Sequence, residues 1–320
     1  MSPAAAKALF LGGGGAGEKA LPGAAKAALG LYLQLTKTKI NLAVAITAVM
    51  GYVMAGGGWD MALPLSIFGT FLLASGAAAL NQWQEAPFDA RMRRTRTRPI
   101  PSGRIRPAGA FFIGVLLLLA GFYMLSSLPQ NRWVVMALGA LAVFWYNGVY
   151  TPLKRVTPFA VVPGALIGAI PPLIGWCAAG GEWNHPLVLH AAFFMYIWQI
   201  PHFWLLLLMY GGQYDDAGLP TLTKVFSRAQ LHRITFMWVL ATAVTGLSLP
   251  AFEGRALLFP WNVAVVLSSV WIAAKGAGLL WRPEAQAEGK PFLRAFMQIN
   301  LYALVVVACL SLSALGMVWP

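Results

Sequence analysis

The chain has 320 residues, of which 59% are hydrophobic and only 10% are charged. Its mean hydropathy is +0.67 and its formal net charge is +13. A soluble domain of this length carries more charge and fewer apolar residues, so the composition excludes that class. The two cysteines, Cys177 and Cys309, fall at different depths of two apolar runs, and we expect no disulfide between them.

Apolar runs of about 20 residues recur along the chain with short polar breaks between them. A helix of that length crosses a hydrocarbon core about 30 Å thick while satisfying its own backbone hydrogen bonds. The sequence therefore predicts an all-α membrane protein with about nine transmembrane helices. The runs cover residues 40–58, 61–81, 108–128, 132–152, 158–179, 187–209, 231–250, 259–281 and 296–319.

The first 30 residues have no apolar stretch long enough for a cleavable signal, because four glycines at 12–15 interrupt the chain. We expect residues 1–30 to form a flexible cytoplasmic tail and residues 31–320 to form one transmembrane domain. Residues 24–36 alternate Ala, Leu and Lys in a way that suits a short helix lying along the membrane surface.

The basic residues are distributed unevenly over the polar breaks. With the N-terminus in the cytoplasm, every Lys and Arg except Arg132, Arg255 and Lys275 falls in a cytoplasmic segment. This positive-inside pattern predicts a multi-pass protein of the inner membrane with its C-terminus outside. It also accounts for the net charge without nucleic acid, for which the chain has no fold signature.

A polar cluster marks the cytoplasmic end of the second run. Asn81 and Glu85 are four residues apart and share a helix face, and Asp89 continues that spacing. Pro87 is predicted to kink or end the helix between them. Two carboxylates with a side-chain amide suit Mg²⁺, which proteins hold through one or two carboxylates plus substrate phosphate oxygens. Polar groups at the membrane boundary are costly unless they face a cavity, so the cluster indicates a functional site.

Basic residues follow the cluster. Arg94 and Arg98 come directly after it, and Lys154 and Arg155 close the fourth run on the same side. Guanidinium groups bind phosphate through paired hydrogen bonds, so these four residues are candidates for binding a diphosphate. The alternative is an ordinary positive-inside loop, and this explanation is favoured for the remaining arginines of the loop, Arg91, Arg96, Arg104 and Arg106.

A second cluster lies at the end of the sixth run. It begins with Gln199 and His202 around a proline and continues with Tyr214, Asp215 and Asp216. The second and sixth runs cross in the same direction, so both clusters should emerge on the cytoplasmic face and meet one bound molecule. A histidine in an apolar helix is often a packing residue, but His202 follows a proline that frees a backbone carbonyl, which favours substrate contact.

These motifs resemble the UbiA superfamily of membrane-embedded prenyltransferases, and within it most closely the haem O synthase (protohaem IX farnesyltransferase) family. The matching residues lie between 37 and about 222. They are Asn81-Gln82, Glu85, Phe88-Asp89, Met92, Arg94-Thr95, Arg98-Pro99, the stretch Tyr150 to Arg155, Thr157-Pro158, Gly168, Pro171-Pro172, Gly175-Trp176, Gln199 and the stretch Pro201 to Trp204.

The resemblance implies nine helices around a central cavity that opens laterally to lipid. It implies that Asn81, Glu85 and Asp89 hold Mg²⁺ on farnesyl diphosphate at the cytoplasmic end. The prenyl acceptor would be the 2-vinyl group of haem b, and haem A synthase becomes a candidate partner. The chain departs from the family pattern at Gly211 and Gln213, where an arginine and an acidic residue are usual.

The sequence leaves two alternatives open. Another member of the superfamily could use an aromatic or quinone-precursor acceptor, since the diphosphate motif is shared. A haem-binding or transport protein without chemistry would belong to a different class, and it would have no need for carboxylates and arginines gathered on one face.

Overall fold

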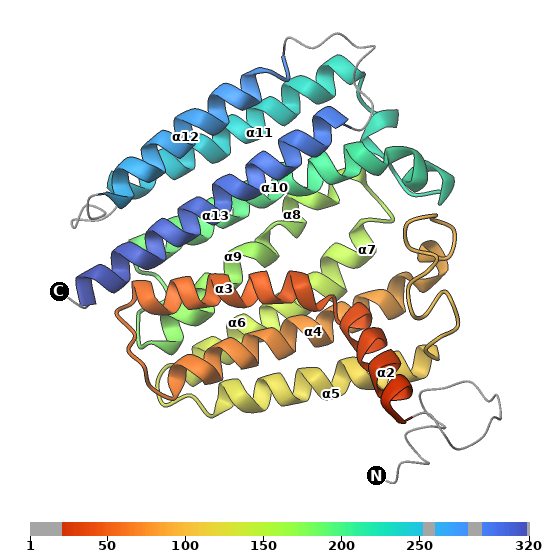
Figure 1. Ribbon diagram of the computed structural model, residues 1–320, viewed down its shortest axis with the longest axis horizontal. Helices are drawn as coiled ribbons and strands as arrows, with labels where there is room; N and C mark the ends of the chain where they lie inside the picture. The colour runs from red at the N-terminus through yellow and green to blue at the C-terminus, as the bar shows by residue number, and fades with distance from the viewer. Residues whose placement is uncertain (1–20, 252–259, 281–289, 319–320) are drawn as a thin grey trace.

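The computed structural model describes residues 21–251, 260–280 and 290–318, and every regular element within these ranges is helical (Figure 1). The helices are α2 (Leu21–Leu35), α3 (Thr38–Met54), α4 (Ala62–Asp89), α5 (Pro107–Ser126), α6 (Arg132–Phe144), the π-helix η1 (Trp145–Tyr150), α7 (Thr151–Leu153), the 3₁₀ turn η2 (Pro158–Ala160), α8 (Val161–Gly164), α9 (Leu166–Ala178), α10 (Pro186–Asp216), η3 (Leu222–Lys224), α11 (Arg228–Ser248), η4 (Leu249–Ala251), α12 (Trp261–Ala277) and α13 (Lys290–Val318).

Seven helical segments of the described chain are long and apolar enough to cross a membrane. α3 and α12 are apolar as well, but each has only 17 residues. Each of the nine predicted runs coincides with one of these segments, so the multi-pass membrane architecture is confirmed, while the count of nine spans stays a prediction. The first run ends before residue 58 because Gly56, with a φ of +79°, stops α3.

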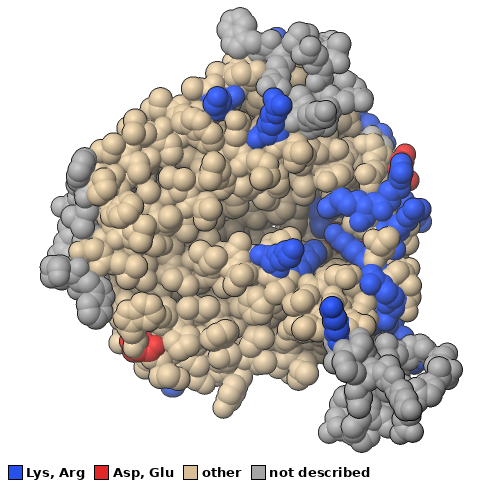
Figure 2. Space-filling view, in the orientation of Figure 1, with Lys and Arg blue, Asp and Glu red and all other residues tan. Residues whose placement is uncertain are grey.

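The long helices run side by side, and the connections that the structure describes gather at two ends of the molecule (Figure 1). α2, the segment joining α4 to α5 and the end of α10 lie at one end, and the last turn of α13 lies at the other. Figure 2 shows most of the visible Lys and Arg side chains over the first of these ends. The charge asymmetry of the sequence is therefore an asymmetry of the folded molecule.

Residues 21–30, which were expected to belong to a flexible tail, lie in α2, and residues 1–20 lie outside the described part of the chain. Leu35 at the end of α2 is fully buried with Ala79 of α4 and Ile105 of the following segment. This apolar contact holds the beginning of the membrane domain against the polar end of α4.

Small residues let the backbones of paired helices approach closely. A Cβ atom added to Gly51 of α3 would collide with the carbonyl of Pro172 in α9, and one added to Gly175 of α9 would collide with the carbonyl of Ala48 in α3. α4 and α5 meet in the same way, since a Cβ on Gly76 would lie 2.7 Å from the Gly114 carbonyl oxygen. Such contacts replace the hydrophobic effect as the packing force inside a membrane.

α4 continues through Pro87 to Asp89, so of the two expected effects of the proline, a kink or an end of the helix, the second is wrong. Pro87 lies in the last turn of α4, and its missing N–H removes one backbone hydrogen bond there. The carbonyls of the last turn lack helical partners in any helix, so the proline disturbs the helix little at this position. The main departure from regular geometry falls in α10 instead, where Tyr210 adopts φ −122° and ψ 15°. The unbroken end of α4 fixes the spacing of the polar cluster.

Candidate active site

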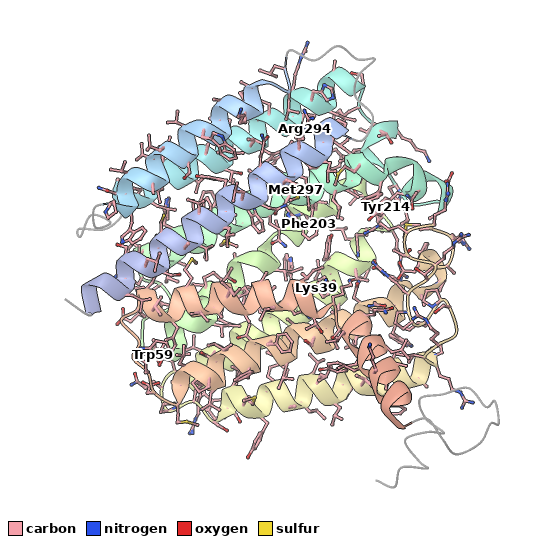
Figure 3. All side chains as sticks on the ribbon, in the orientation of Figure 1. Lys39, Trp59, Phe203, Tyr214, Arg294 and Met297 are labelled. Atoms are coloured by element: carbon pink, nitrogen blue, oxygen red, sulfur yellow. The ribbon has the colours of Figure 1, made fainter. Side chains whose placement is uncertain are left out.

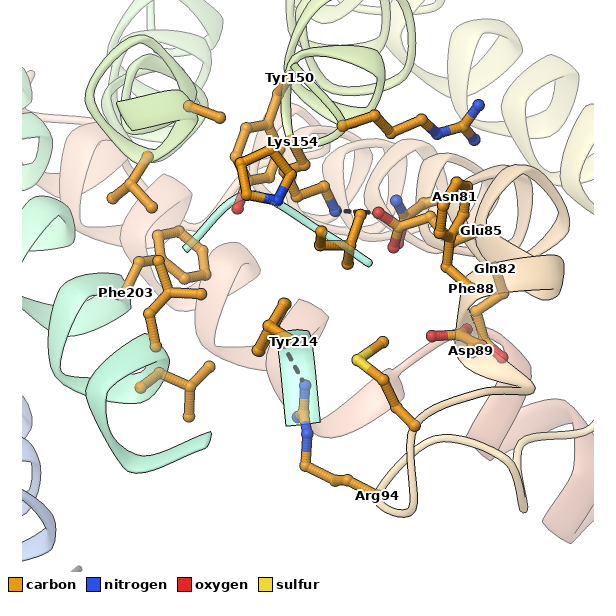
Figure 4. A pocket seen from close by; sticks show the side chains of 18 of the residues that line it. Asn81, Gln82, Glu85, Phe88, Asp89, Arg94, Tyr150, Lys154, Phe203 and Tyr214 are labelled. Carbon is orange, nitrogen blue, oxygen red and sulfur yellow. Dashed lines mark hydrogen bonds and ion pairs between the residues drawn. The ribbon is translucent and has the colours of Figure 1, made fainter. Parts of the chain in front are cut away.

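A cavity of about 300 Å³ lies between the polar end of α4 and α10. Figure 4 shows α4 presenting Asn81, Glu85 and Asp89 on one side of it, with Phe203 of α10 opposite. Polar and charged side chains line one part, and apolar side chains line the other. The polar lining is Gln34, Lys37, Asn81, Gln82, Glu85, Asp89, Arg94, Arg98, Tyr146, Tyr150, Lys154, Arg155, Thr157 and Tyr214; the apolar lining includes Ile40, Phe88, Met92, Val161, Phe203, Leu206, Leu207 and Leu219.

The three polar residues of α4 share one face because they follow one another at intervals of four. Asn81 and Asp89 are buried, and Glu85 is half-buried. The Asn81 amide donates to Thr151 Oγ1 at 2.9 Å, which orients its carbonyl oxygen toward the cavity side. A side-chain amide and two carboxylates thus project into a single space.

Each carboxylate of this face is paired with a cation from another segment. Asp89 Oδ2 accepts from Arg98 Nη1 at 2.7 Å. Glu85 forms an ion pair with Lys154, which comes from the segment after α7. Since burying a carboxylate without a partner is very costly, these pairs explain how the acidic face is tolerated beside apolar helices.

Cations outnumber carboxylates around the cavity. Lys37, Arg94, Arg98, Lys154 and Arg155 all line it, against Glu85 and Asp89 among the described residues. The excess positive charge sits in a partly enclosed space, where electrostatic attraction is stronger than in water. The arrangement can therefore bind a ligand that carries several negative charges.

Arg155 and Lys154 are positioned by the π-helix η1 and the short α7 that follows it. Arg155 donates to the Gln84 carbonyl at 2.7 Å, and its guanidinium lies 4.9 Å from the ring centre of Phe88. The Lys154 ammonium lies 4.7 Å from the ring centre of Tyr150. π-Helical turns are frequent at functional sites, and this one aims Tyr146 and Tyr150 at the cavity.

Lys37 lines the cavity as well, although the sequence alone gives no sign of it. It adopts a left-handed conformation, φ 50° and ψ 42°, just before α3. Its ammonium donates to Asn81 Oδ1 at 2.8 Å and to the Tyr146 hydroxyl at 3.4 Å. Burial lowers the pKa of Lys37, and the positive charge of Arg98 lowers it further, from 10.5 to about 8. In sequence it looks like an ordinary membrane anchor, because only the fold brings it to α4.

The segment after α4 reaches across to α10 through Arg94. Its backbone N–H donates to Gln213 Oε1 at 3.0 Å, and its guanidinium donates to the Tyr214 hydroxyl at 3.3 Å (Figure 4). The same guanidinium lies 4.9 Å from the Tyr210 ring centre. The two sequence clusters therefore meet, and Gln213 supplies an acceptor at the junction.

Not every candidate of the second cluster reaches the cavity. Asp216 is exposed and does not line it, and the side chain of Asp215 lies outside the described residues. Gln199 does not line it either; its Oε1 is buried without a partner in the described structure, against Gly168. His202 faces α13, where its Nδ1 lies 2.6 Å from Asn300 Oδ1.

The donor set on α4 fits a hard divalent cation with few protein ligands. Within the described residues, no group of three or more His, Cys, Asp or Glu side chains is placed to hold a metal ion. Glu85, Asp89 and the Asn81 carbonyl oxygen are all oxygen donors on one face of one helix. Mg²⁺ commonly takes one or two carboxylates and completes its shell with phosphate oxygens and water, so this set suits it.

Comparison with known proteins identifies the class. Residues 44–302 match the UbiA prenyltransferase family, and the chain belongs to that family of membrane enzymes. It is 36% identical to the protoheme IX farnesyltransferase of Oleidesulfovibrio alaskensis over 272 residues, which are 85% of this chain and 92% of that one. It is 35% identical to the protein of the same name from Geobacter sulfurreducens, over 86% of this chain and 98% of that one.

The fold has solved counterparts. A UbiA homologue from Archaeoglobus fulgidus bound to GPP and Mg²⁺ superimposes with a TM-score of 0.61 at 12% identity, covering 88% of this chain and 99% of that one. At so low an identity the likeness concerns the fold alone. It confirms the expected UbiA-type helical architecture.

Proposed function

We propose that this protein transfers the farnesyl group of farnesyl diphosphate to the 2-vinyl group of haem b, giving haem O. The names of relatives that are aligned over most of their length support the substrates. The observation that carries the proposal is the cavity itself, which joins a cation-rich end to an apolar interior. A prenyl diphosphate has the same division into a charged head and an apolar chain.

The charged end would bind the diphosphate. Asn81, Glu85 and Asp89 are the residues that would hold Mg²⁺, which supplies positive charge to the leaving oxygen when bound. Arg98 and Lys154 now neutralise the two carboxylates, and their charge would add to that of Arg94 on the phosphate groups. Groups placed in advance around a developing charge lower the barrier more than the same groups do in water.

The apolar end would hold the farnesyl chain and keep water away. Val161, Phe203, Leu206 and Leu207 form this part of the lining. Between the two ends lie the stacked rings of Tyr146 and Tyr150, 5.9 Å apart. Aromatic faces attract cations, so these rings suit an allylic cation formed beside them.

The reaction balances with one molecule of water. The C1–O bond of farnesyl diphosphate breaks, and the diphosphate leaves with the electron pair. The vinyl group of haem b supplies two electrons to C1, which leaves a carbocation next to the porphyrin ring. Water adds to that carbocation and releases one proton, which completes the hydroxyethylfarnesyl group.

The charge distribution supports a location in the inner membrane. The end with the basic side chains (Figure 2) would face the cytoplasm of the inner membrane, and the end of α13 (Figure 1) would face the other side. A water-soluble diphosphate would then enter from the cytoplasm, while haem would come from the lipid side. Haem A synthase, as a partner that takes the product, belongs to the same proposal.

The test is pyrophosphate release by the purified protein in detergent, with farnesyl diphosphate, Mg²⁺ and one acceptor at a time. Release with haem b, and its loss with a chelator, is expected. Release with a phenolic or quinone-precursor acceptor but not with haem b would contradict the proposal and favour another branch of the family. No release with any acceptor would favour a haem-binding or transport protein.

A further inference from the structure

α10 and α13 pack against each other, and a hydrogen bond between His202 and Asn300 joins them. The Asn300 amide nitrogen donates to the Phe296 carbonyl at 2.7 Å. Because a carbonyl only accepts, this bond fixes which end of the amide faces the histidine. Asn300 therefore offers its oxygen to Nδ1 of His202, 2.6 Å away, and Nδ1 must carry the proton.

A neutral imidazole with its proton on Nδ1 has a lone pair on Nε2. No described residue pairs with Nε2 of His202, and the side chain is only half-buried. An imidazole whose N–H is held by an oxygen acceptor, and whose second nitrogen has no described hydrogen-bond partner, has the arrangement of metal-ligating histidines.

The surroundings of the imidazole are aromatic. The ring centres of Trp198, Phe296 and Phe203 lie 5.0, 4.9 and 5.2 Å from that of His202. Phe203 also lines the cavity, so the histidine stands directly behind the cavity wall. Flat apolar surfaces of this kind suit a porphyrin, whose faces are apolar and whose centre is an iron that binds imidazole nitrogen.

The place is also open to the outside of the helix bundle. Figure 2 shows a hollow in the molecular face, and Figure 3, in the same orientation, labels Phe203 and Lys39 on its two sides. Met297, one residue after Phe296, is 62% exposed on the same part of α13. A large lipid-soluble molecule can approach from this side without passing the charged end of the cavity.

We infer that His202 is the ligand that the iron of the haem acceptor takes through Nε2, and that Asn300 is the positioning residue that holds this tautomer. The inference rests on the proposed function, because it takes an iron porphyrin as the acceptor. Ligation at this point would hold the porphyrin beside Phe203, whose ring also lines the cavity proposed for the prenyl chain.

If the hydrogen bond only stabilised the packing of α10 against α13, its loss would lower the stability of the protein but would leave the coordination of the haem iron unchanged. The test is therefore the visible absorption of haem b titrated into the full-length protein in detergent. His202→Ala should abolish the spectral shift of an imidazole-bound haem, and added imidazole should restore it. Asn300→Leu should weaken haem binding about tenfold, the usual size of an outer-shell effect on a metal site. Asn300→Asp, which keeps an acceptor at the same place, should bind haem as the wild type does.

Ser311→Ala is the matched control, since it removes one hydrogen bond, to the Val307 carbonyl at 2.8 Å, from the same helix. It should leave the haem spectrum unchanged. If His202→Ala and Asn300→Leu kept the wild-type spectrum while the wild type formed product, iron ligation would be overturned and the proposed function would stand. If the wild type neither shifted the haem spectrum nor formed product, both would fall.

Discussion

Lys37 and Asn81 are 44 positions apart in the chain, yet the Lys37 ammonium donates to Asn81 Oδ1 at 2.8 Å. The contact places a positive charge at the first residue of the acidic face of α4. The proposed metal ion and the diphosphate would both bind at this end of the acidic face. We therefore place Lys37 in the proposed anion site and expect its protonation to control diphosphate binding there.

We predict that the affinity for farnesyl diphosphate falls as the pH rises through 8. With a pKa of about 8, the charged fraction of Lys37 falls about tenfold between about pH 7 and about pH 9. Losing this charge removes one attraction to the diphosphate. The measurement is KM for farnesyl diphosphate over this range.

Lys37→Arg is the control for the Lys37 prediction, since a guanidinium stays charged throughout the range. Its KM should change less with pH than that of the wild type. Equal pH profiles for the two proteins would show that Lys37 does not control binding. The free energy of unfolding should change in the opposite direction. The pKa of Lys37 is about 8 in the folded protein and about 10 in the unfolded chain, so between these values the unfolded chain binds more protons, and a rise in pH stabilises the folded state.

Replacing either carboxylate of α4 by its amide should nearly abolish turnover. Glu85→Gln and Asp89→Asn keep the shape of each side chain and remove its charge, so the proposed Mg²⁺ site loses a ligand. We expect kcat to fall by about 10²–10³, by analogy with the loss of one oxyanion donor. Glu182→Gln, an exposed residue in the connection between α9 and α10, should have full activity. Near-normal rates in the two α4 variants would rule out the metal proposal.

The hydrogen bond between Arg94 and Gln213, which joins the two clusters, gives a separate prediction. Gln213→Leu removes the acceptor for the Arg94 backbone N–H and should loosen the loop that carries Arg94 and Arg98. Turnover should fall about tenfold, because misplaced binding groups lose much of their effect. Gln213→Glu keeps the acceptor and should retain activity, as measured by initial rates. If both variants behaved alike, the hydrogen bond would not matter.

The contact between α3 and α9 can be tested through stability. Gly175→Ala puts a methyl group into the Ala48 carbonyl and should lower the free energy of unfolding by about 1–3 kcal/mol. Gly30→Ala is the matched control, since a Cβ there meets nothing within 4 Å. Thermal unfolding in detergent would compare them, and equal midpoints would show that the close approach is not needed.

The helical architecture could be read from the sequence because a bilayer imposes a length and an apolar character on each span. The residues at which the helices begin and end could not be predicted in this way. α4 runs beyond residue 81 to Asp89 because its last polar turns face a cavity, and average hydropathy treats such turns as a loop. α13 begins at Lys290, before the apolar run that the sequence shows.

The site was predictable where its residues lie close together in sequence. Asn81, Glu85 and Asp89 follow a helical spacing, and the cations near them line the same cavity. The sequence marks His202 but neither its partner Asn300 nor Lys37, because these contacts join distant helices, for which one sequence carries no signal. The second cluster was expected to meet the bound molecule because its run crosses the membrane in the same direction as the second run; Tyr214 lines the cavity, but Asp216 does not.

The most direct measurement is the mass of the haem recovered after incubating the purified protein with haem b, farnesyl diphosphate and Mg²⁺. We predict a haem heavier by one farnesyl group and one hydroxyl group, formed by the wild type and not by Glu85→Gln or by the wild type with a chelator. Unmodified haem from a protein that still releases pyrophosphate with another acceptor would contradict the assignment of haem b as the substrate.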